Sequence, residues 1–263
     1  MSGDKMVTIY INGKAVQAKE DEMVLTAIRR EGINIPTLCN HDAIEPCGAC
    51  RLCMVEITKK DWNGWKKHVT SCLYPVEPEL MVSTHTPQVL ELRRTILELY
   101  LARNPNSSVI QKLAEEHGIT STPYEIIPDG DNCIMCYACT RICDALGCHA
   151  ISAVERGHEK VIAGPLNQPP IDCIGCLSCA HICPTNFIEW KDSDGRRSIW
   201  GREFELLTCK TCGKKTITRD FAEYLSKNRD LPMSYFETCD DCKRLDTAKT
   251  MGRLVVMAAE VAK

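Results

Sequence analysis

The sequence of 263 residues has no long apolar run and no concentration of charge of one sign. Its first residues, MSGDKMVTIYING, lack the apolar core of a secretory signal, and no later stretch approaches the roughly 18 apolar residues of a membrane span. The net charge is −3 and the lysines and arginines are scattered, whereas phosphate binding needs a concentrated basic face. We therefore expect a cytoplasmic chain with no membrane span and no nucleic-acid partner.

The sequence also lacks the short motifs of common catalytic sites. GxGxxG, the P-loop, GxSxG and HExxH are all missing, and the seven histidines are scattered. We expect no catalytic residue in this chain, so that substrate chemistry would take place on a partner.

Cysteine, in contrast, is abundant, with 18 in the chain. In a reducing compartment, cysteines clustered at short fixed spacings are metal ligands far more often than disulfides. Free thiols in such number would also invite oxidation. The cysteines therefore predict several metal centres.

The stretch before the first cysteines predicts a hairpin followed by a helix. VTIYINGKAV alternates apolar and polar residues and turns at Asn12-Gly13, a dipeptide that favours a type I′ turn. DEMVLTAIRREG has an acidic start, apolar residues on one helical face and Gly32 where a C-terminal cap would lie. A hairpin, a helix and then a cysteine loop is the order in which a β-grasp ferredoxin domain begins. The apolar residues of these two elements are Val7, Ile9, Ile11, Val24, Leu25 and Ile28.

Further helices and a hairpin are expected along the chain. A helix should begin at Pro87, and a second one should carry a capping box at Ser108 and Gln111 and stop at Gly118. The stretch 150–164 predicts a hairpin with Gly157 near its turn, and 248–263 predicts a modest amphipathic helix. The residues that we expect along one face of the first helix are Leu90, Leu97 and Leu101.

An internal repeat is the strongest signal. CIMCYACTRIC and CIGCLSCAHIC both have the spacing C-x2-C-x2-C-x3-C, in which three cysteines bind one 4Fe-4S cluster and the fourth binds the other. Pro184 gives the second run its C-P ending, whereas Asp144 stands at that place in the first. Paired zinc sites fit this spacing poorly, since a zinc ion takes four ligands and each run supplies three ligands for its own site and a fourth for the other. One cluster would be held by Cys133, Cys136, Cys139 and Cys183, and the other by Cys143, Cys173, Cys176 and Cys179.

The cysteines between residues 39 and 72 allow two groupings. Cys47, Cys50 and Cys53 could bind a third 4Fe-4S cluster together with Cys39 or Cys72. The alternative is a 2Fe-2S site of spacing C-x10-C-x2-C-x18-C, in which Cys47 is a bystander. We favour the second because a β-grasp pattern precedes it and no fourth cysteine follows after three residues. Its ligands would be Cys39, Cys50, Cys53 and Cys72.

The last four cysteines form the pairs CKTC and CDDC. Their spacing, C-x2-C-x26-C-x2-C, and a glycine after the first pair suit structural tetrahedral zinc in a ribbon. A further iron-sulfur cluster is the alternative. The expected zinc ligands are Cys209, Cys212, Cys239 and Cys242, which leaves Cys47 and Cys148 outside every set.

These motifs resemble a known family over residues 5 to 190. A β-grasp with PCGACRLCMVE, then helices, then CIMCYACTRICDALGCHAISAVERG, is similar to the electron-input module of the large iron-sulfur subunit of complex I. NAD-linked hydrogenases, formate dehydrogenases and electron-bifurcating transhydrogenase complexes share this module. Many relatives hold one more cluster through a histidine and three cysteines, but residues 73–132 contain no cysteine and we expect that cluster to be absent.

The resemblance implies an electron-transfer subunit between a flavin and NAD(P)H site and a second redox subunit or ferredoxin. An electron-bifurcating transhydrogenase or hydrogenase complex is the favoured context, with a formate dehydrogenase wiring subunit as the alternative. A scaffold with purely structural clusters is an alternative of another class. The expected fold is α+β: a β-grasp 2Fe-2S domain (1–84), a helical linker (85–125), a bacterial-type ferredoxin domain with two 4Fe-4S clusters (126–200) and a zinc-ribbon-like domain with a terminal helix (201–263).

Overall fold

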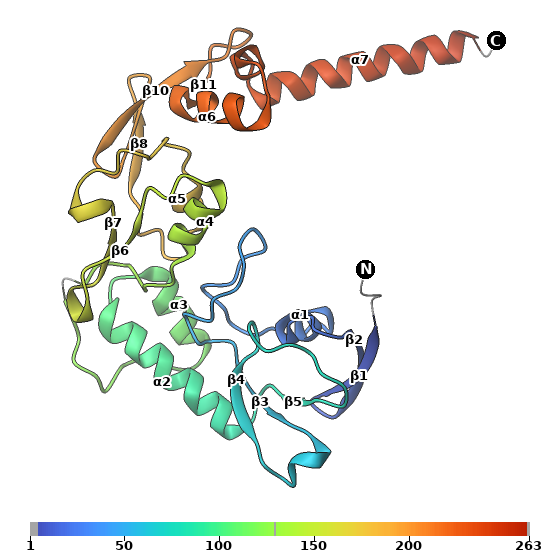
Figure 1. The fold of residues 1–263 in the computed structure, drawn as a ribbon, viewed down its shortest axis with the longest axis vertical. Helices are drawn as coiled ribbons and strands as arrows, with labels where there is room; N and C mark the ends of the chain where they lie inside the picture. The colour runs from blue at the N-terminus through green and yellow to red at the C-terminus, as the bar shows by residue number, and fades with distance from the viewer. Residues whose placement is uncertain (1–4, 129, 262–263) are drawn as a thin grey trace. The chain divides into compact units, whose positions relative to one another are not determined.

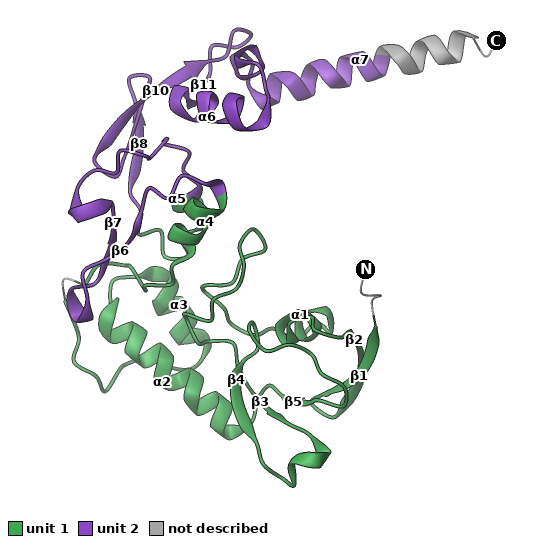
Figure 2. Ribbon diagram, viewed as in Figure 1, with its two compact units in different colours: residues 1–145, 179–187 green, residues 146–178, 188–263 purple. Residues whose placement is uncertain are grey.

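The computed structural model describes residues 5–128 and 130–261. Two compact units make up the chain, as Figure 2 shows. Unit 1 consists of residues 1–145 and 179–187, and unit 2 consists of residues 146–178 and 188–263. The chain therefore leaves unit 1 and returns to it once. The four-part division expected from the sequence stays a prediction.

Both units combine helices and strands, so the expected α+β character is confirmed (Figure 1). The strands are β1 (Met6–Ile11), β2 (Lys14–Lys19), β3 (Met54–Thr58), β4 (Lys67–Thr70), β5 (Met81–Ser83), β6 (Ser152–Val154), β7 (Val161–Ala163), β8 (Trp190–Ser193), β9 (Arg196–Ile199), β10 (Arg202–Thr208) and β11 (Lys215–Thr218). The helices are α1 (Val24–Arg30), α2 (Pro87–Arg103), α3 (Ser108–Glu116), α4 (Ala138–Leu146), α5 (Ser178–Ile182), α6 (Arg219–Arg229) and α7 (Asp240–Val261).

Unit 1 begins with a five-stranded mixed sheet in the order β2-β1-β5-β3-β4. The predicted hairpin is confirmed: β1 pairs antiparallel with β2, and both turn residues, Asn12 (φ 50°) and Gly13 (φ 84°), have the positive φ of a type I′ turn. The parallel pairing of β1 with β5 joins this hairpin to β3 and β4. All six apolar residues expected in these elements are buried in one core.

The predicted acidic start of α1 is wrong. The helix begins at Val24 after Met23, and no acidic residue lies in its first turn. Glu22 instead accepts hydrogen bonds from Arg30 at the other end of the helix, at 2.8 and 3.0 Å. The ion pair therefore links the strand-to-helix turn to the end of α1.

Helix α2 begins at Pro87 as predicted, with the Thr86 side chain accepting from the amide of Val89 at 3.3 Å. Its buried face, however, differs from the expected one. Leu97 is buried, but Leu90 is 45% exposed, because the buried positions follow the i, i+4 spacing of Val89, Arg93 and Leu97.

The predicted capping box of α3 is also wrong. Ser107, and not Ser108, is the N-cap residue, and it makes no side-chain capping bond. The Gln111 side chain donates to the Pro105 carbonyl at 2.6 Å instead of reaching the N-cap amide. Helix α3 packs beside α2, and Gly118 (φ 70°) ends it as expected.

Unit 2 contains the predicted hairpin of β6 and β7, with Gly157 between them, and a four-stranded antiparallel sheet in the order β11-β10-β9-β8. This four-stranded sheet is not among the elements predicted from the sequence. Helix α6 packs on β10 and β11. Helix α7 begins at Asp240, earlier than the predicted start at Ala248, and its side chains beyond Gly252 lie outside the described residues, where most of the predicted amphipathic pattern falls.

None of the described helices combines the length and the apolarity that crossing a membrane would require.

Candidate metal centres

The structure brings the four cysteines expected at the 2Fe-2S site together. Cys39 and Cys50 lie on the long loop between α1 and β3, Cys53 directly precedes β3, and Cys72 follows β4. Each is 1% exposed. The Sγ atoms of Cys53 and Cys72 are 3.4 Å apart, and the amide of Cys50 donates to Cys39 Sγ at 3.4 Å. The four thiols thus form two pairs, the arrangement that a site with two iron atoms requires.

The thiols of each pair differ in acidity. A hydrogen bond with Cys39 lowers the pKa of Cys50 to about 6, and a hydrogen bond with Cys72 lowers the pKa of Cys53 to about 7. The same bonds raise the pKa of Cys39 and Cys72. In each pair one thiol is therefore the more acidic, and the thiolate is the form that binds iron. This set of four converging thiols fits a 2Fe-2S cluster.

The backbone of the ligand loop makes a close approach at Gly48. Its φ is +64°, and a Cβ atom there would lie 2.5 Å from Leu73 Cδ1. Cys47, which the spacing predicts to be a bystander of the 2Fe-2S site, donates from its half-buried thiol to the Cys136 carbonyl at 3.7 Å. Cys47 therefore faces the neighbouring ligand segment, and its exclusion from the 2Fe-2S site stays a prediction.

The first of the two expected 4Fe-4S sets also lies within unit 1. Cys133 and Cys136 precede α4, Cys139 lies in its first turn, and Cys183 follows α5. Burial first, and then the charges of Cys183 and Cys133, raise the pKa of Cys136 to about 11. Burial and then the charges of its neighbours likewise raise the pKa of Cys139. Three buried thiols and the half-buried Cys183 fit a cluster whose iron would offset their negative charge.

The second expected set is divided between the units. Cys143 and Cys179 belong to unit 1, whereas Cys173 and Cys176 belong to unit 2, and their joint ligation stays a prediction.

Unit 2 holds the segment 173–176 through residues that sequence analysis missed. Arg202 donates to the Cys173 carbonyl at 2.8 Å, and Arg197 donates to the Gly175 carbonyl at 3.1 Å. The Thr218 hydroxyl donates to the Ile174 carbonyl at 2.6 Å. These residues lie on β9, β10 and β11, so no spacing in the sequence could have indicated them.

Arg141 joins the two ligand segments of unit 1. Its guanidinium donates to the carbonyls of Cys39, at 2.8 Å, and of Glu45, and more weakly to that of Cys136, at 3.4 Å. Tyr100 donates from its hydroxyl to the Cys50 carbonyl at 3.3 Å. Burial raises the pKa of Tyr100, and the nearby cysteines raise it further.

The two ligand segments also share one apolar core. It contains Cys39, Cys50 and Cys136 together with Leu97 of α2 and Ile110 of α3. Side chains of both helices therefore pack around the region between the 2Fe-2S ligands and the first 4Fe-4S ligands.

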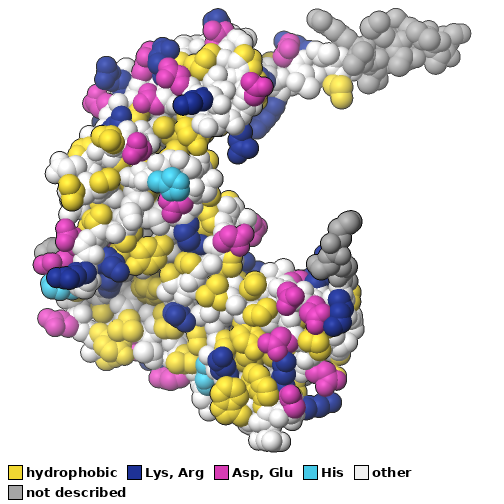
Figure 3. Space-filling model, viewed as in Figure 1, with side chains coloured by type: hydrophobic (Ala, Val, Ile, Leu, Met, Phe, Trp, Pro, Cys, Tyr) yellow, Lys and Arg dark blue, Asp and Glu magenta, His cyan; other side chains and the backbone are white. Residues whose placement is uncertain are grey.

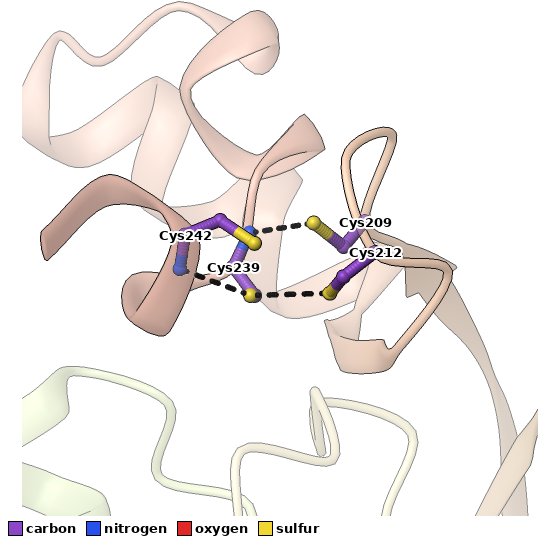
Figure 4. A group of neighbouring side chains, drawn as sticks. All are labelled: Cys209, Cys212, Cys239 and Cys242. Atoms are coloured by element: carbon purple, nitrogen blue, oxygen red, sulfur yellow. Dashed lines mark hydrogen bonds between the residues drawn. The ribbon is translucent and has the colours of Figure 1, made fainter. Parts of the chain in front are cut away.

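The C-terminal cysteines form a compact group in unit 2, drawn in Figure 4. All four Sγ atoms of Cys209, Cys212, Cys239 and Cys242 lie within 4.8 Å of one another, and those of Cys212 and Cys239 are 3.7 Å apart. Zinc–sulfur bonds of about 2.3 Å place the sulfurs of a tetrahedron about 3.8 Å apart. The spacing therefore fits one tetrahedral ion.

Backbone amides support the sulfurs of this group. The amide of Cys239 donates to Cys209 Sγ at 3.2 Å, and the amide of Cys242 donates to Cys239 Sγ at 3.5 Å. Amide hydrogen bonds, first from Cys239 and then from Cys212, lower the pKa of Cys209 to about 6. Gly213 (φ 75°) completes the knuckle after the first pair.

The surface around these sites carries mixed charge. On the face that Figure 3 shows, Lys and Arg side chains are interspersed with Asp and Glu. The exposed ion pairs Lys210–Glu237 (2.6 Å) and Lys214–Asp241 (3.0 Å) border the C-terminal group.

Comparisons with known proteins agree with the N-terminal site. Residues 4–87 match the family described as a 2Fe-2S iron-sulfur cluster binding domain. Among curated proteins, the NADP-reducing hydrogenase subunit HndD of Solidesulfovibrio fructosivorans is 34% identical over 211 residues, which is 68% of this chain and 35% of that protein. The NADPH-Fe(3+) oxidoreductase subunit alpha of Geobacter sulfurreducens is 29% identical over 247 residues, 85% of this chain and 28% of that protein.

A solved structure is similar as well. The crystal structure of an NAD⁺-reducing [NiFe]-hydrogenase in the H2-reduced state aligns with a TM-score of 0.59 and 27% identity, covering 69% of this chain and 86% of that chain. This chain spans about a third of the length of the curated relatives described above.

Proposed function

Because this chain is an iron-sulfur protein homologous to subunits of NAD(P)-linked hydrogenases, NADPH-dependent oxidoreductases and NADH-quinone oxidoreductase, we propose that it is an electron-transfer subunit of such a complex. It would carry electrons between a flavin and NAD(P)H site on one partner and a second redox subunit or ferredoxin. The favoured context is an electron-bifurcating transhydrogenase or hydrogenase.

The observation that carries this proposal is the shared core of unit 1. Cys39 and Cys50 of the 2Fe-2S set and Cys136 of a 4Fe-4S set lie in one apolar cluster. Arg141 holds the carbonyls of Cys39 and Cys136 with one guanidinium. Two cysteine sets that pack in one core would hold their clusters close together, and stepwise electron transfer needs such proximity, whereas purely structural sites do not.

When bound, the clusters would supply one-electron chemistry between a two-electron hydride donor and one-electron carriers. The residues of this chain would hold and shield them. Cys39, Cys50, Cys53 and Cys72 would bind one 2Fe-2S cluster. The 4Fe-4S ligands would be Cys133, Cys136, Cys139 and Cys183 for one cluster, and Cys143, Cys173, Cys176 and Cys179 for the other.

We further propose that the C-terminal group binds zinc. The mutual distances of Cys209, Cys212, Cys239 and Cys242 support a single ion, because the ligands of a multi-iron cluster surround a larger object. Zinc has no redox chemistry, so this site would stabilise unit 2 and take no part in electron transfer.

Anaerobic purification of the tagged chain from its native cell, with identification of co-eluting chains, flavin and pterin, tests the proposal. Co-elution with an NAD(P)-binding flavoprotein is expected, and recovery of the chain alone with intact clusters would contradict the complex. A pterin-containing partner would indicate a formate dehydrogenase instead.

Metal analysis of the same preparation tests the centres. About ten iron and one zinc per chain are expected from one 2Fe-2S cluster, two 4Fe-4S clusters and one zinc ion. About fourteen iron without zinc would show that the C-terminal group binds another cluster.

A further inference from the structure

Arg93 is the bulkiest fully buried side chain of the described residues. It lies on the inner face of α2 and is 2% exposed. Its Nη2 donates to the carbonyl of Met54 at 2.7 Å, and its Nε has no hydrogen-bond partner. The ion pairs of the described residues include none with Arg93, so no carboxylate compensates its charge.

An isolated guanidinium in such a place is costly, because burial removes the water that stabilises its charge. Natural proteins pair such a charge with an anion. The arginine that follows on the same helix illustrates the difference: the Arg94 side chain is 55% exposed and donates to Glu98 at 2.9 Å. Arg93 therefore needs a compensating anion, and no carboxylate side chain among the described residues supplies it.

A negative charge that acts on Arg93 comes from the cysteine set beside it. Met54, whose carbonyl Arg93 holds, is the residue after Cys53. Burial lowers the pKa of Arg93, and the one charge that acts in the opposite direction is that of Cys53. The charge of Arg93 also acts on His85. Burial lowers the pKa of His85, and the positive charge of Arg93 lowers it further.

We propose that Arg93 is the buried counter-charge of the 2Fe-2S cluster and raises its reduction potential. The inference rests on the proposed ligands Cys39, Cys50, Cys53 and Cys72. Reduction adds one electron to a cluster that four thiolates already make negative. A fixed positive charge in a low-dielectric core stabilises the reduced form more than the oxidised form, so it favours electron uptake.

The test is a redox titration of the full, cluster-loaded chain, followed through the EPR signal of the reduced 2Fe-2S cluster. In Arg93→Gln we expect the ratio of reduced to oxidised cluster at a fixed potential to fall about tenfold. That change equals a shift of about 59 mV to lower potential for a one-electron couple. Arg93→Lys retains the charge and should stay close to wild type.

Arg94→Gln is the matched control. It removes the same charge from the same helix at an exposed position, where solvent screens it, and should leave the potential unchanged. The 4Fe-4S signals serve as an internal control in every variant. An unchanged 2Fe-2S potential in Arg93→Gln, or an equal shift in Arg94→Gln, would overturn the proposal.

Loss of the cluster is also informative. If Arg93→Gln and the apolar Arg93→Met both lose the 2Fe-2S signal while Arg93→Lys keeps it, the positive charge is the property that the cluster requires. If Arg93→Lys loses it as well, Arg93 has a structural role only and the proposal fails. A wild-type chain without any 2Fe-2S signal would instead refute the proposed cluster and leave Arg93 without a partner.

Discussion

Arg141 should control the opening of the loop that carries Cys39. Its guanidinium holds the carbonyls of Cys39 and Glu45, close to the two ends of the segment 40–44. A pocket of about 600 Å³ borders this segment, and a second arginine, Arg29, holds it only at its start, through the Asn40 side chain at 2.8 Å. Replacing Arg141 by Met removes both hydrogen bonds and retains much of the volume of the side chain.

The magnitude follows from these two bonds. A hydrogen bond to a charged group contributes about 1.5–3 kcal/mol, and the lower value applies because Arg141 is half-buried. Two bonds then contribute about 3 kcal/mol, and each 1.4 kcal/mol is a factor of about ten, so loop opening should become about a hundredfold more frequent. Arg141→Lys, which can reach one carbonyl, should give about half of this free-energy change.

Amide hydrogen exchange measures the opening directly. The amide of Ile44, which donates to the His41 carbonyl at 3.2 Å, reports on this loop, and exchange is followed by anaerobic mass spectrometry on the cluster-loaded chain. Substitution of the exposed Arg156 by Met is the matched control. If residues 40–46 exchange equally fast in Arg141→Met and in wild type, the guanidinium does not hold the loop and the reasoning is refuted.

Two further predictions concern the same loop. Cys47→Ser should leave the rhombic 2Fe-2S EPR signal intact while Cys50→Ser abolishes it, and loss of the signal in both would place Cys47 among the ligands. Gly48→Ala should accelerate cluster loss in guanidinium, because a left-handed φ costs an alanine about 1–2 kcal/mol and its Cβ would overlap Leu73. Leu73→Ala should relieve part of this effect in the double variant, and strict additivity of the two substitutions would disprove the close approach.

The cysteine groups could be proposed from the sequence because ligand spacing is a local property. A C-x2-C pair places two thiols within one turn of the chain. The hairpin pattern before Cys39 predicts the sheet that supports the cysteine loop. The residues that hold these loops could not be predicted from the sequence, because they are distant from the cysteines along the chain. Arg141 lies 102 positions from Cys39, and Arg202 lies 29 positions from Cys173, so only the fold brings each pair together.

Helix α2 shows a second limit of pattern reading. Hydrophobic periodicity assigns an arginine to the surface, so it selected Leu90, which is exposed, and overlooked Arg93, which is buried. A charged side chain is buried in a core only when another group there compensates its charge. The hydrophobic periodicity of a helix gives no information about whether a metal cluster lies beside it. Arg93, the position that the periodicity assigns to the wrong face, is the proposed counter-charge of the cluster.

The excursion of the chain out of unit 1 has a consequence for biosynthesis. Cys133, Cys136 and Cys139 belong to the first stretch of unit 1, but Cys183 belongs to the second, after residues 146–178 of unit 2. A nascent chain thus presents three thiols of this proposed set well before the fourth has left the ribosome. The proposed 4Fe-4S ligand set is therefore complete only after residue 183 has emerged, whereas the four thiols proposed for the 2Fe-2S cluster are all present once Cys72 has emerged.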